Sequence, residues 1–378
     1  MFHLQCSSMN YDWGKNGEAS LVYRILSENE QSDLKDDIPY AELWMGDHPK
    51  GPSRTRDGVL ISKLEGCNLP FLFKVLSIQK PLSIQVHPNR ELSSILHSND
   101  PVNYPDGNHK PEMSFFIKKT KLLYGFRRYE EIIDFFRKID ELRELVDESK
   151  LEVFIKDPTP DNFMPLLREI FHSKGKSLIR LINSFLKNIE KYEIDGDLVE
   201  VVLLIHQYFP NDVGVFLPFI TNVVEGEPGM SLFIPTGVIH SYLYGDLLEA
   251  MALSDNVIRA GMTPKHIDVD ILLKTVNCEP TPIHWVEPKV LSPNHIVFIP
   301  PLLSNEFLLH SYKFEANTTN VISDIVNESI LLVLDGFGII NNEEYHKSSI
   351  ILTLKNQNIS VTTKANTHII FCTHSNTK

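Results

Sequence analysis

Short apolar runs bounded by proline and glycine dominate the first third of the chain. Residues 70–78 and 81–87 are two such runs, and their length and composition are typical of β-strands. We therefore expect residues 1–125 to form sheet with long loops.

The period changes at Tyr129, where apolar residues begin to recur every three or four positions among acidic and basic ones. The apolar positions are Ile132, Ile133, Phe135, Phe136, Ile139, Leu142 and Leu145. This spacing predicts a helix. Further helices are expected after Asp161, with Pro165 in the first turn, and over residues 177–189 and 198–208. Residues 126–212 are thus predicted to be helical.

The strand pattern returns at residues 213–220 and continues through residues 229–263. If the β segments on both sides form one unit, the helices are an insertion into it. The expected organisation is a discontinuous β domain (1–125 and 213–285), an inserted helical domain (126–212) and a C-terminal β domain (286–378). In the last of these we expect strands over residues 307–314, 329–334, 348–354 and 368–373, and we assign this domain a packing role.

Composition and charge narrow the function classes. Of 378 residues, 42% are hydrophobic and 22% are charged, which is typical of a soluble folded protein. No apolar run approaches the roughly 20 residues that cross a bilayer, and the N-terminus lacks a leader pattern, so a cytoplasmic location is expected. A net charge of −13 disfavours nucleic acid and anionic membranes as partners. The scattered cysteines, without C-x-x-C spacing, are expected to be reduced thiols: Cys6, Cys67, Cys278 and Cys372.

Candidate chemistry lies in two parts of the chain. His240 follows a Pro-x-Gly turn, and strand periodicity places Gln85 and His87 on one face. Glu112 follows Lys110 by two positions in an extended Lys-Pro-Glu segment. One amide oxygen, two imidazoles and one carboxylate suit zinc or another divalent first-row metal. The same residues are equally explained as hydrogen-bonded structural groups and a loop acid.

Charged residues inside apolar segments favour a site over plain core, because an unpaired buried charge is costly. These residues are Lys74, Lys110, Glu249, Asp255, Arg259 and Lys265.

Residues 229–240 match the second cupin motif, Gly-x5-Pro-x-Gly-x2-His, although Tyr244 replaces its later Asn. Several stretches, in the right order, resemble the type I phosphomannose isomerases: residues 11–15, 41–53, 71–89, 109–112 and 249–265. Met262 and Ser241 stand where the family commonly has leucine and alanine. The resemblance covers most of residues 1–125 and 213–275. It implies a mainly β fold with an α-helical insertion, in which two cupin-like jelly-roll β-barrels accompany a helical domain.

The resemblance also implies an activity: a zinc-dependent aldose–ketose isomerase that interconverts mannose 6-phosphate and fructose 6-phosphate through an enediol. Its substrate is a small sugar phosphate, no obligate protein partner is evident, and its product supplies mannose units for glycoconjugates. Carried over by motif, one zinc ion per chain has four ligands, Gln85, His87, Glu112 and His240. Arg259 matches the active-site arginine of the family and suits stabilisation of an enediolate.

The remaining roles stay open at the level of the sequence. Candidates for proton transfer are Lys110, Asp255, Glu249, His109 and Tyr242. Candidates for the substrate phosphate are Lys74, Ser83 and Lys265, although Lys265 is equally explained as a solvated cation at a helix start. Trp13 and Trp44 line the pocket or, in the simpler interpretation, belong to the sheet core.

Two rival functions are compatible with the same residues. An Fe(II) cupin oxygenase would use two histidines and a carboxylate, for which His87, His240 and Glu112 are available. A sugar-binding or structural cupin would need no aligned Arg259, Lys110 and Asp255.

Overall fold

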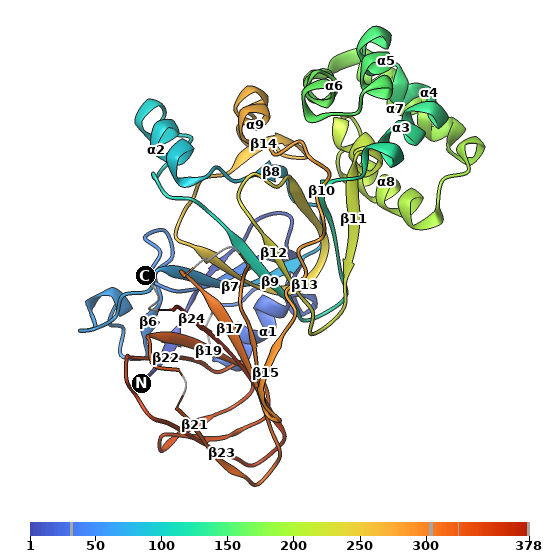
Figure 1. Ribbon diagram of the computed structural model, residues 1–378. Helices are drawn as coiled ribbons and strands as arrows, with labels where there is room; N and C mark the ends of the chain where they lie inside the picture. The colour runs from blue at the N-terminus through green and yellow to red at the C-terminus, as the bar shows by residue number, and fades with distance from the viewer. Residues whose placement is uncertain (31–32, 302–304, 324, 376–378) are drawn as a thin grey trace.

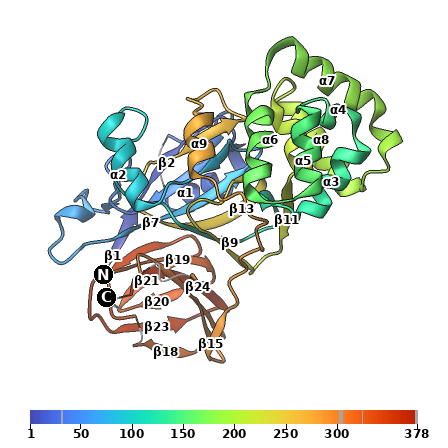
Figure 2. The same ribbon diagram turned by 45° about the horizontal axis from the view of Figure 1, so that its top comes forward.

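The computed structural model describes residues 1–30, 33–301, 305–323 and 325–375. Two sheet-rich parts of the chain lie one above the other, and a cluster of helices stands to one side (Figure 1). The same arrangement is visible after rotation (Figure 2). The protein is therefore rich in sheet with additional helices, as the sequence predicts. Among the described residues, no helix is both long enough and apolar enough to span a membrane.

Ten described strands form the first sheet, in which all pairings are antiparallel. Its main path runs β11-β10-β13-β7-β5-β2, while β8 pairs with β13 and β14, and β9 pairs with β12 and β13. The strands are β2 (Ser7–Met9), β5 (Glu42–Met45), β7 (Phe71–Ile78), β8 (Ile84–Val86), β9 (Glu112–Phe116), β10 (Thr120–Phe126), β11 (Thr221–Gly226), β12 (Ser231–Ile234), β13 (His240–Ala252) and β14 (Ile258–Gly261).

Strand β13 is the centre of the first sheet, because its two halves pair with different neighbours. Its first half pairs with β10 and β8, and its second half with β7 and β9. Between the halves stands Gly245, whose φ is +139°. A Cβ there would lie only 2.2 Å from Oγ1 of Thr120, so the close approach of β10 requires glycine.

Strand β7 shows why buried strands of the first sheet have continuous apolar sequences. All of its residues are buried. Phe71, Phe73 and Val75 pack into the core shared with the C-terminal part of the chain, whereas Leu76 and Ile78 face the opposite core. Burial of both faces removes the polar alternation of a one-sided strand. Lys74 is the charged exception, and it points to the second face.

The second sheet is formed mainly by the C-terminal β region, which comprises the described residues from 286 onward. Eight described strands follow the order β15-β16-β17-β24-β19-β22-β1-β6. They are β15 (Lys289–Ser292), β16 (His295–Phe298), β17 (Leu308–Phe314), β24 (Thr367–Thr373), β19 (Ser329–Asp335), β22 (Ile350–Thr353), β1 (Phe2–Gln5) and β6 (Arg54–Thr55). The four strands expected from the sequence in this region are all present.

Two N-terminal strands belong to this second sheet. Phe2 of β1 lies opposite Leu352 of β22, and β6 pairs with β1. Two smaller sheets complete the β structure. They consist of β18 (Thr319–Ile322), β23 (Ile359–Thr363), β20 (Gly338–Ile340) and β21 (Glu343–Tyr345), and of β3 (Lys15–Asn16) with β4 (Pro39–Tyr40).

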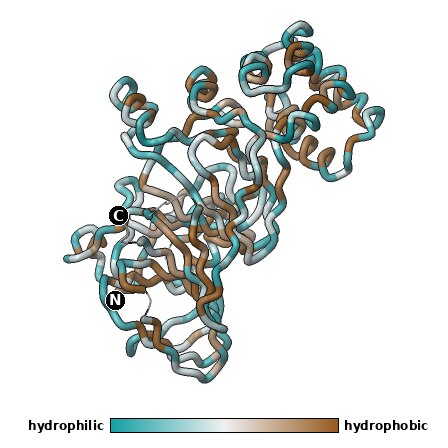
Figure 3. Tube along the Cα trace, in the orientation of Figure 1, coloured by the Kyte–Doolittle hydropathy of each residue, from teal (hydrophilic) through white to brown (hydrophobic). Residues whose placement is uncertain are grey.

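The helical segment lies between β10 and β11 in the chain and alternates apolar and polar positions along its trace (Figure 3). It contains α3 (Tyr129–Lys138), α4 (Asp140–Arg143), α5 (Glu148–Lys156), α6 (Pro160–His172), α7 (Gly175–Asn188), η3 (Ile189–Tyr192) and α8 (Gly196–Tyr208). Helix α6 begins at Pro160, so Pro165 lies inside the helix and not in the first turn. Outside this segment lie η1 (Gly17–Ala19), α1 (Leu21–Glu28), η2 (Ile61–Lys63), α2 (Arg90–Asn99) and α9 (Val269–Thr275).

The predicted strand over residues 213–220 is wrong, because Val213–Phe219 forms the 3-10 helix η4. The Asp212 carboxylate accepts a hydrogen bond from the backbone N–H of Gly214 and so caps this turn. Pro218 has no N–H to donate to a sheet. The run is apolar because every one of its residues is buried, and a short buried helix and a buried strand have the same apolar pattern.

Candidate metal centre and active site

Strand register aligns two of the expected ligands with the expected arginine. His240 of β13 lies opposite Gln85 of β8, and Gln85 lies opposite Arg259 of β14. Directly opposed residues of an antiparallel pair share a face. The three side chains therefore form one row across the first sheet.

A second row crosses the other half of β13. Glu249 lies opposite Lys74 of β7, and Lys74 lies opposite Trp44 of β5. On the other side of β13, Glu249 lies opposite Ser114 of β9, which is two positions after Glu112. Glu112 is thus on the same face as this second row, and its carboxylate reaches His240 of the first row.

Three buried side chains converge at this contact. His87, Glu112 and His240 each offer a ligand atom within 4.8 Å of the others. Nε2 of His87 lies 3.2 Å from Oε1 of Glu112, and Nε2 of His240 lies 3.5 Å from Oε2. No other group of three or more His, Cys, Asp or Glu residues with this geometry occurs in the described part of the chain.

In each histidine of this cluster, the ring nitrogen that faces the Glu112 carboxylate is a hydrogen-bond acceptor. Nδ1 of His87 is 2.8 Å from the carbonyl oxygen of Asn256, and Nδ1 of His240 is 3.0 Å from that of Val238. A carbonyl can only accept, so in a neutral ring Nδ1 holds the proton and Nε2 is an acceptor. Nε2 of His87 and Oε2 of Glu112 have no hydrogen-bond partner. Buried acceptors facing one another are stabilised by a cation between them, which fits zinc.

Gln85 lies beside this cluster, with its amide nitrogen 3.2 Å from Nε2 of His240. Its amide oxygen accepts a hydrogen bond of 3.4 Å from Ser83. Rotation of the amide by 180° exchanges the two atoms and turns the oxygen toward the histidines. In that orientation the chain offers the four-ligand set of one amide oxygen, one carboxylate and two imidazoles.

The protonation states also suit a metal. Burial lowers the pKa of His87 to about 4, and nearby Lys110 acts in the same direction. Burial alone would raise the pKa of Glu112, but Lys110 and His87 hold it well below its ordinary value. Nζ of Lys110 donates to Oε1 of Glu112 at 2.6 Å. A neutral imidazole and an ionised carboxylate are the forms that bind metal ions.

A second charge cluster lies along the Lys74 row. Nζ of Lys74 is 3.2 Å from Glu249 and 3.6 Å from Glu42, and all three residues are buried. Burial alone would lower the pKa of Lys74, but the two carboxylates raise it, so this lysine remains a cation. Burial, together with the charge of Glu112, raises the pKa of Glu249.

Comparison with known proteins places the chain in a family. The family model for the catalytic domain of type I phosphomannose isomerases matches residues 1–129. A mannose-6-phosphate isomerase from Bos taurus is 34% identical over 372 residues, covering 89% of this chain and 88% of its own, and the one from Homo sapiens is 36% identical over 312 residues, covering 74% of each. The chain belongs to the type I phosphomannose isomerases.

Solved structures of this family agree in fold with the whole chain. A mannose-6-phosphate isomerase from Salmonella typhimurium, bound to fructose 6-phosphate and zinc, has a TM-score of 0.85 and 28% sequence identity. The match covers 99% of each chain. The helical segment and the C-terminal β region are therefore included in the structural likeness to this isomerase, although the family model ends at residue 129.

Not all the expected residues of this isomerase lie beside the metal cluster. Asp255 is partly exposed, and its carboxylate oxygens lie 3.3 Å from Nε2 of His48 and 2.9 Å from Nζ of Lys50. Burial would raise the pKa of Asp255, but the hydrogen bonds from His48 and Lys50 lower it well below its usual range. Asp255 is consequently a weak base.

The two candidates for phosphate binding at the surface also differ in setting. Lys265 is exposed in the loop before α9, with Nζ 4.6 Å above the Tyr11 ring, and it does not start the helix. Ser83 is half-buried beside Gln85.

Two further candidates lie at the edges of the cluster. Tyr242, on β13, is buried with its hydroxyl unpartnered, and burial raises its pKa well above the ordinary value. His109 is partly exposed and bonds to Glu306 of the C-terminal β region.

The tryptophans divide between core and periphery. Trp44 is buried in a small apolar cluster with Leu72 and Met251. Trp13 is partly buried and stacks on Tyr11.

Sequence reasoning missed two residues that complete the site. Glu42 shares Lys74 with Glu249 and accepts a hydrogen bond from the Trp44 indole. Asn256 positions the His87 ring through its carbonyl oxygen. Glu42 lies within the family-like stretch at residues 41–53, so its buried charge was a usable signal. A backbone carbonyl leaves no such signal in the sequence.

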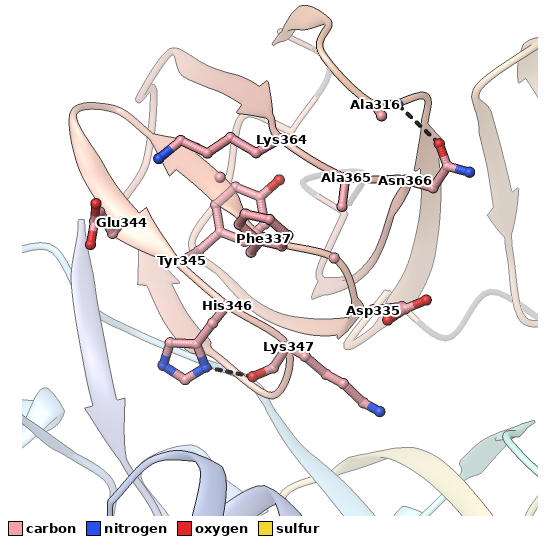
Figure 4. Close-up of a pocket in the computed structure, with 12 residues that line it drawn as sticks. Ala316, Asp335, Phe337, Glu344, Tyr345, His346, Lys347, Lys364, Ala365 and Asn366 are labelled. Carbon is pink, nitrogen blue, oxygen red and sulfur yellow. Dashed lines mark hydrogen bonds between the residues drawn. The ribbon is translucent and has the colours of Figure 1, made fainter.

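An open cavity of about 850 Å³ lies in the C-terminal β region, far from the metal cluster in the chain (Figure 4). Its walls include Phe337, Tyr345 and His346, and Figure 4 shows Lys364 and Lys347 on opposite sides of Phe337. The His346 ring bonds to the carbonyl of Lys347, and the Tyr345 hydroxyl bonds to Thr367. These side chains do not converge on one point, unlike those of the metal cluster.

Proposed function

We propose that the chain interconverts mannose 6-phosphate and fructose 6-phosphate by an enediol route, with one zinc ion held by Gln85, His87, Glu112 and His240. The observation that carries the proposal is the convergence of buried acceptor atoms from His87, Glu112 and His240, where strand register links His240 through Gln85 to Arg259. The zinc-bound relative with fructose 6-phosphate supports the same conclusion. A bound zinc ion supplies Lewis-acid stabilisation of negative charge on sugar oxygens.

Arg259 has the role of charge stabiliser in this proposal. Isomerisation moves a proton between C1 and C2 and places negative charge on O1 and O2. The guanidinium lies in the row of Gln85 and His240, so it shares their face of the sheet. Its planar N–H groups suit two neighbouring oxygens through charge-assisted hydrogen bonds.

Proton transfer falls to a residue inside the site, and the surroundings rank the candidates. Lys110 is buried within 2.6 Å of a ligand carboxylate, and Glu249 has a raised pKa. A raised carboxyl pKa brings an acid or base closer to neutral pH, where it works best. Tyr242 and His109 are less favoured candidates. Asp255 is also less favoured, because His48 and Lys50 stabilise its anionic form.

For the substrate phosphate we propose Lys265 with Ser83. Lys265 is exposed beside the Tyr11 ring, and burial of its ammonium group together with the nearby charge of Arg259 lowers its pKa. Lys74 was the third candidate, but its charge is balanced by Glu42 and Glu249. A phosphate would have to displace one of these carboxylates to gain from it, so we give Lys74 the role of positioning Glu249.

We further propose that the chain has three domains. These are a discontinuous catalytic domain (1–125 and 213–285), an inserted helical domain (126–212) and a C-terminal β domain (286–378), with both β domains cupin-like. The insertion between β10 and β11 supports this division. A cytoplasmic location and a role in mannose supply stay predictions.

A coupled assay tests the function. Purified protein, loaded with zinc, is given mannose 6-phosphate, and fructose 6-phosphate is converted onward by a coupling enzyme while absorbance is followed. We expect turnover that a chelator abolishes and added zinc restores. No turnover in zinc-loaded protein would contradict the proposal. Iron in the purified protein, with oxygen uptake, would favour the oxygenase; sugar-phosphate binding without turnover would favour a binding protein.

A further inference from the structure

One carboxylate of the C-terminal β region reaches the segments that carry the metal cluster. Glu306 lies just before β17, and its Oε1 is 2.6 Å from Nε2 of His109 and 3.1 Å from a guanidinium nitrogen of Arg90. The same Arg90 nitrogen is 3.0 Å from Nε2 of His109. The three groups therefore form a compact triangle between the two β regions.

The two partners of Glu306 stand next to different parts of the site. His109 directly precedes Lys110, and Glu112 follows three positions later. Arg90 is the first residue of α2, three positions after His87, and the Asn89 side chain caps that helix. A single carboxylate thus joins the segment that carries His87 to the segment that carries Lys110 and Glu112.

The loop of residues 106–109 is also held on its other side, by residues 254–256. The Asp106 carboxylate accepts from the Ser254 hydroxyl and from the backbone N–H of Asp255. Asn256, whose carbonyl bonds the His87 ring, donates its side-chain amide to the Asp106 carbonyl. Residues 106–109 are accordingly held from both sides, by the loop that orients His87 and by Glu306.

The triangle is partly shielded from water. The side chains of Glu306 and His109 are 20% and 24% exposed, whereas that of Arg90 is 61% exposed. Charge-assisted bonds at partly buried positions are screened less than those at the surface. Inside the site, the distances from Glu112 to Lys110 and His87 are 2.6 and 3.2 Å, so a small displacement of either segment would break them.

We propose that Glu306 is a positioning residue for the active site, through which the C-terminal β region holds His87 and Glu112 at their working separation. This inference rests on the proposed function for its kinetic consequences, but the metal site alone gives it a second readout. An ordinary contact between two parts of a chain would add stability without changing turnover or metal retention. Glu306 differs because both of its partners adjoin ligand segments.

The test compares Glu306→Ala and Glu306→Gln with a matched control, Glu343→Ala. Glu343 is also a glutamate of the C-terminal β region that pairs with a histidine, His3, at 3.4 Å, but it adjoins no ligand segment. For each zinc-loaded protein, kcat and KM are measured with mannose 6-phosphate. The rate at which a chelator removes zinc and the midpoint of thermal unfolding are measured beside them.

We expect Glu306→Ala to lower kcat and speed zinc release, each by about 10-fold, which is the scale of residues that orient metal ligands. KM should change less than about 2-fold, because the substrate contacts remain. Glu306→Gln should recover part of both effects, since its amide oxygen still accepts from Arg90. Glu343→Ala should match the wild type in kcat and zinc release.

Two results would overturn the inference. Wild-type kcat and zinc release in Glu306→Ala, with a lower unfolding midpoint, would show a contact that only stabilises the fold. Equal effects in Glu306→Ala and Glu343→Ala would show a general perturbation of the C-terminal β region. If the wild type has no isomerase activity, the proposed function fails by itself. Zinc release then decides the role of Glu306, because faster release in Glu306→Ala supports it and equal release refutes it.

Discussion

The two β regions have similar strand patterns but opposite interiors. The first β region, which comprises the strands of the first sheet and their adjoining loops, buries these charged side chains: Lys74, Lys110, Glu42, Glu112 and Glu249. The corresponding interior of the C-terminal β region is an apolar cluster that includes Tyr312, Val333, Ile351, Val361 and Phe371. Antiparallel sheet alternation produces both interiors, so the difference lies in the residues placed on the inward face.

This difference shows what an interior site requires. A buried charge costs several kcal/mol unless it is paired, so each charged residue of the first region stands beside an opposite charge or a predicted metal. The C-terminal β region also buries two histidines, His295 and His310, but these bond to each other at 2.7 Å. One nitrogen of each ring is used in that bond. In the first region, Nε2 of both His87 and His240 faces Glu112.

The largest expected effect comes from removing a ligand of the proposed metal site. His240→Ala and Glu112→Ala should each lose zinc and reduce turnover by about 10³-fold or more, because a buried partner set is left incomplete. His295→Ala, which removes a buried histidine of the other region, should keep zinc and turnover. Metal analysis of the purified proteins gives the answer. Full zinc occupancy in both ligand variants would remove these residues from the ligand set.

A smaller effect is expected from Arg259→Ala. Zinc should remain bound at one ion per chain, while turnover falls by about 10² to 10³, the usual scale for a lost charge-stabilising donor. Arg127→Ala is the matched control, since Arg127 is a largely buried arginine outside the site that donates to the carbonyl of Pro218. Kinetics and metal analysis are measured together. Near-normal turnover in Arg259→Ala would exclude the arginine from the mechanism.

The smallest effect concerns acid stability and the C-terminal β region. Burial lowers the pKa of His368 to about 4, with Lys313 acting in the same direction. Between pH about 4 and pH about 6.5, His368 binds a proton in the unfolded chain but not in the folded one. The free energy of unfolding therefore has its full value above pH about 6.5 and decreases as the pH falls toward about 4. We expect His368→Gln, which keeps a partner for Ser311, to flatten this dependence by on the order of 2 kcal/mol.

The measurement is the free energy of unfolding by denaturant at several pH values, compared between wild type and variant. The site histidines are present in both proteins, so their contribution cancels in the difference. Identical pH profiles would show that His368 does not sense acid in the folded state.

Local patterns predicted several contacts of the candidate site. The alternation at Gln85 and His87, the turn before His240 and the i, i+2 relation of Lys110 and Glu112 depend only on neighbouring residues. The structure confirms their consequences, because Lys110 contacts Glu112 and His240 begins β13. The amphipathic spacing from Tyr129 to Leu145 likewise predicted a helix, which the structure divides into α3 (129–138) and the short α4 (140–143).

Tertiary packing decided the parts that local patterns could not. The buried run at residues 213–219 forms a 3-10 helix because a cap and a proline outweigh its strand-like composition. Phe2 and His3 pair with β22, almost the whole chain away, because tertiary folding brings the edge of the second sheet beside them. Glu42 joins Lys74 and Glu249 only because β5 and β13 flank β7.

The sequence by itself determined which residue types stand at each short-range position, and therefore the family, the candidate ligands and most elements. Only the tertiary structure decided which of these residues meet. Strand register, the rotation of the His87 ring by a backbone carbonyl and the reach of Glu306 across two regions all depend on contacts between distant segments. The physical reason is that backbone hydrogen bonds and side-chain packing select one pairing among many that local propensity allows equally.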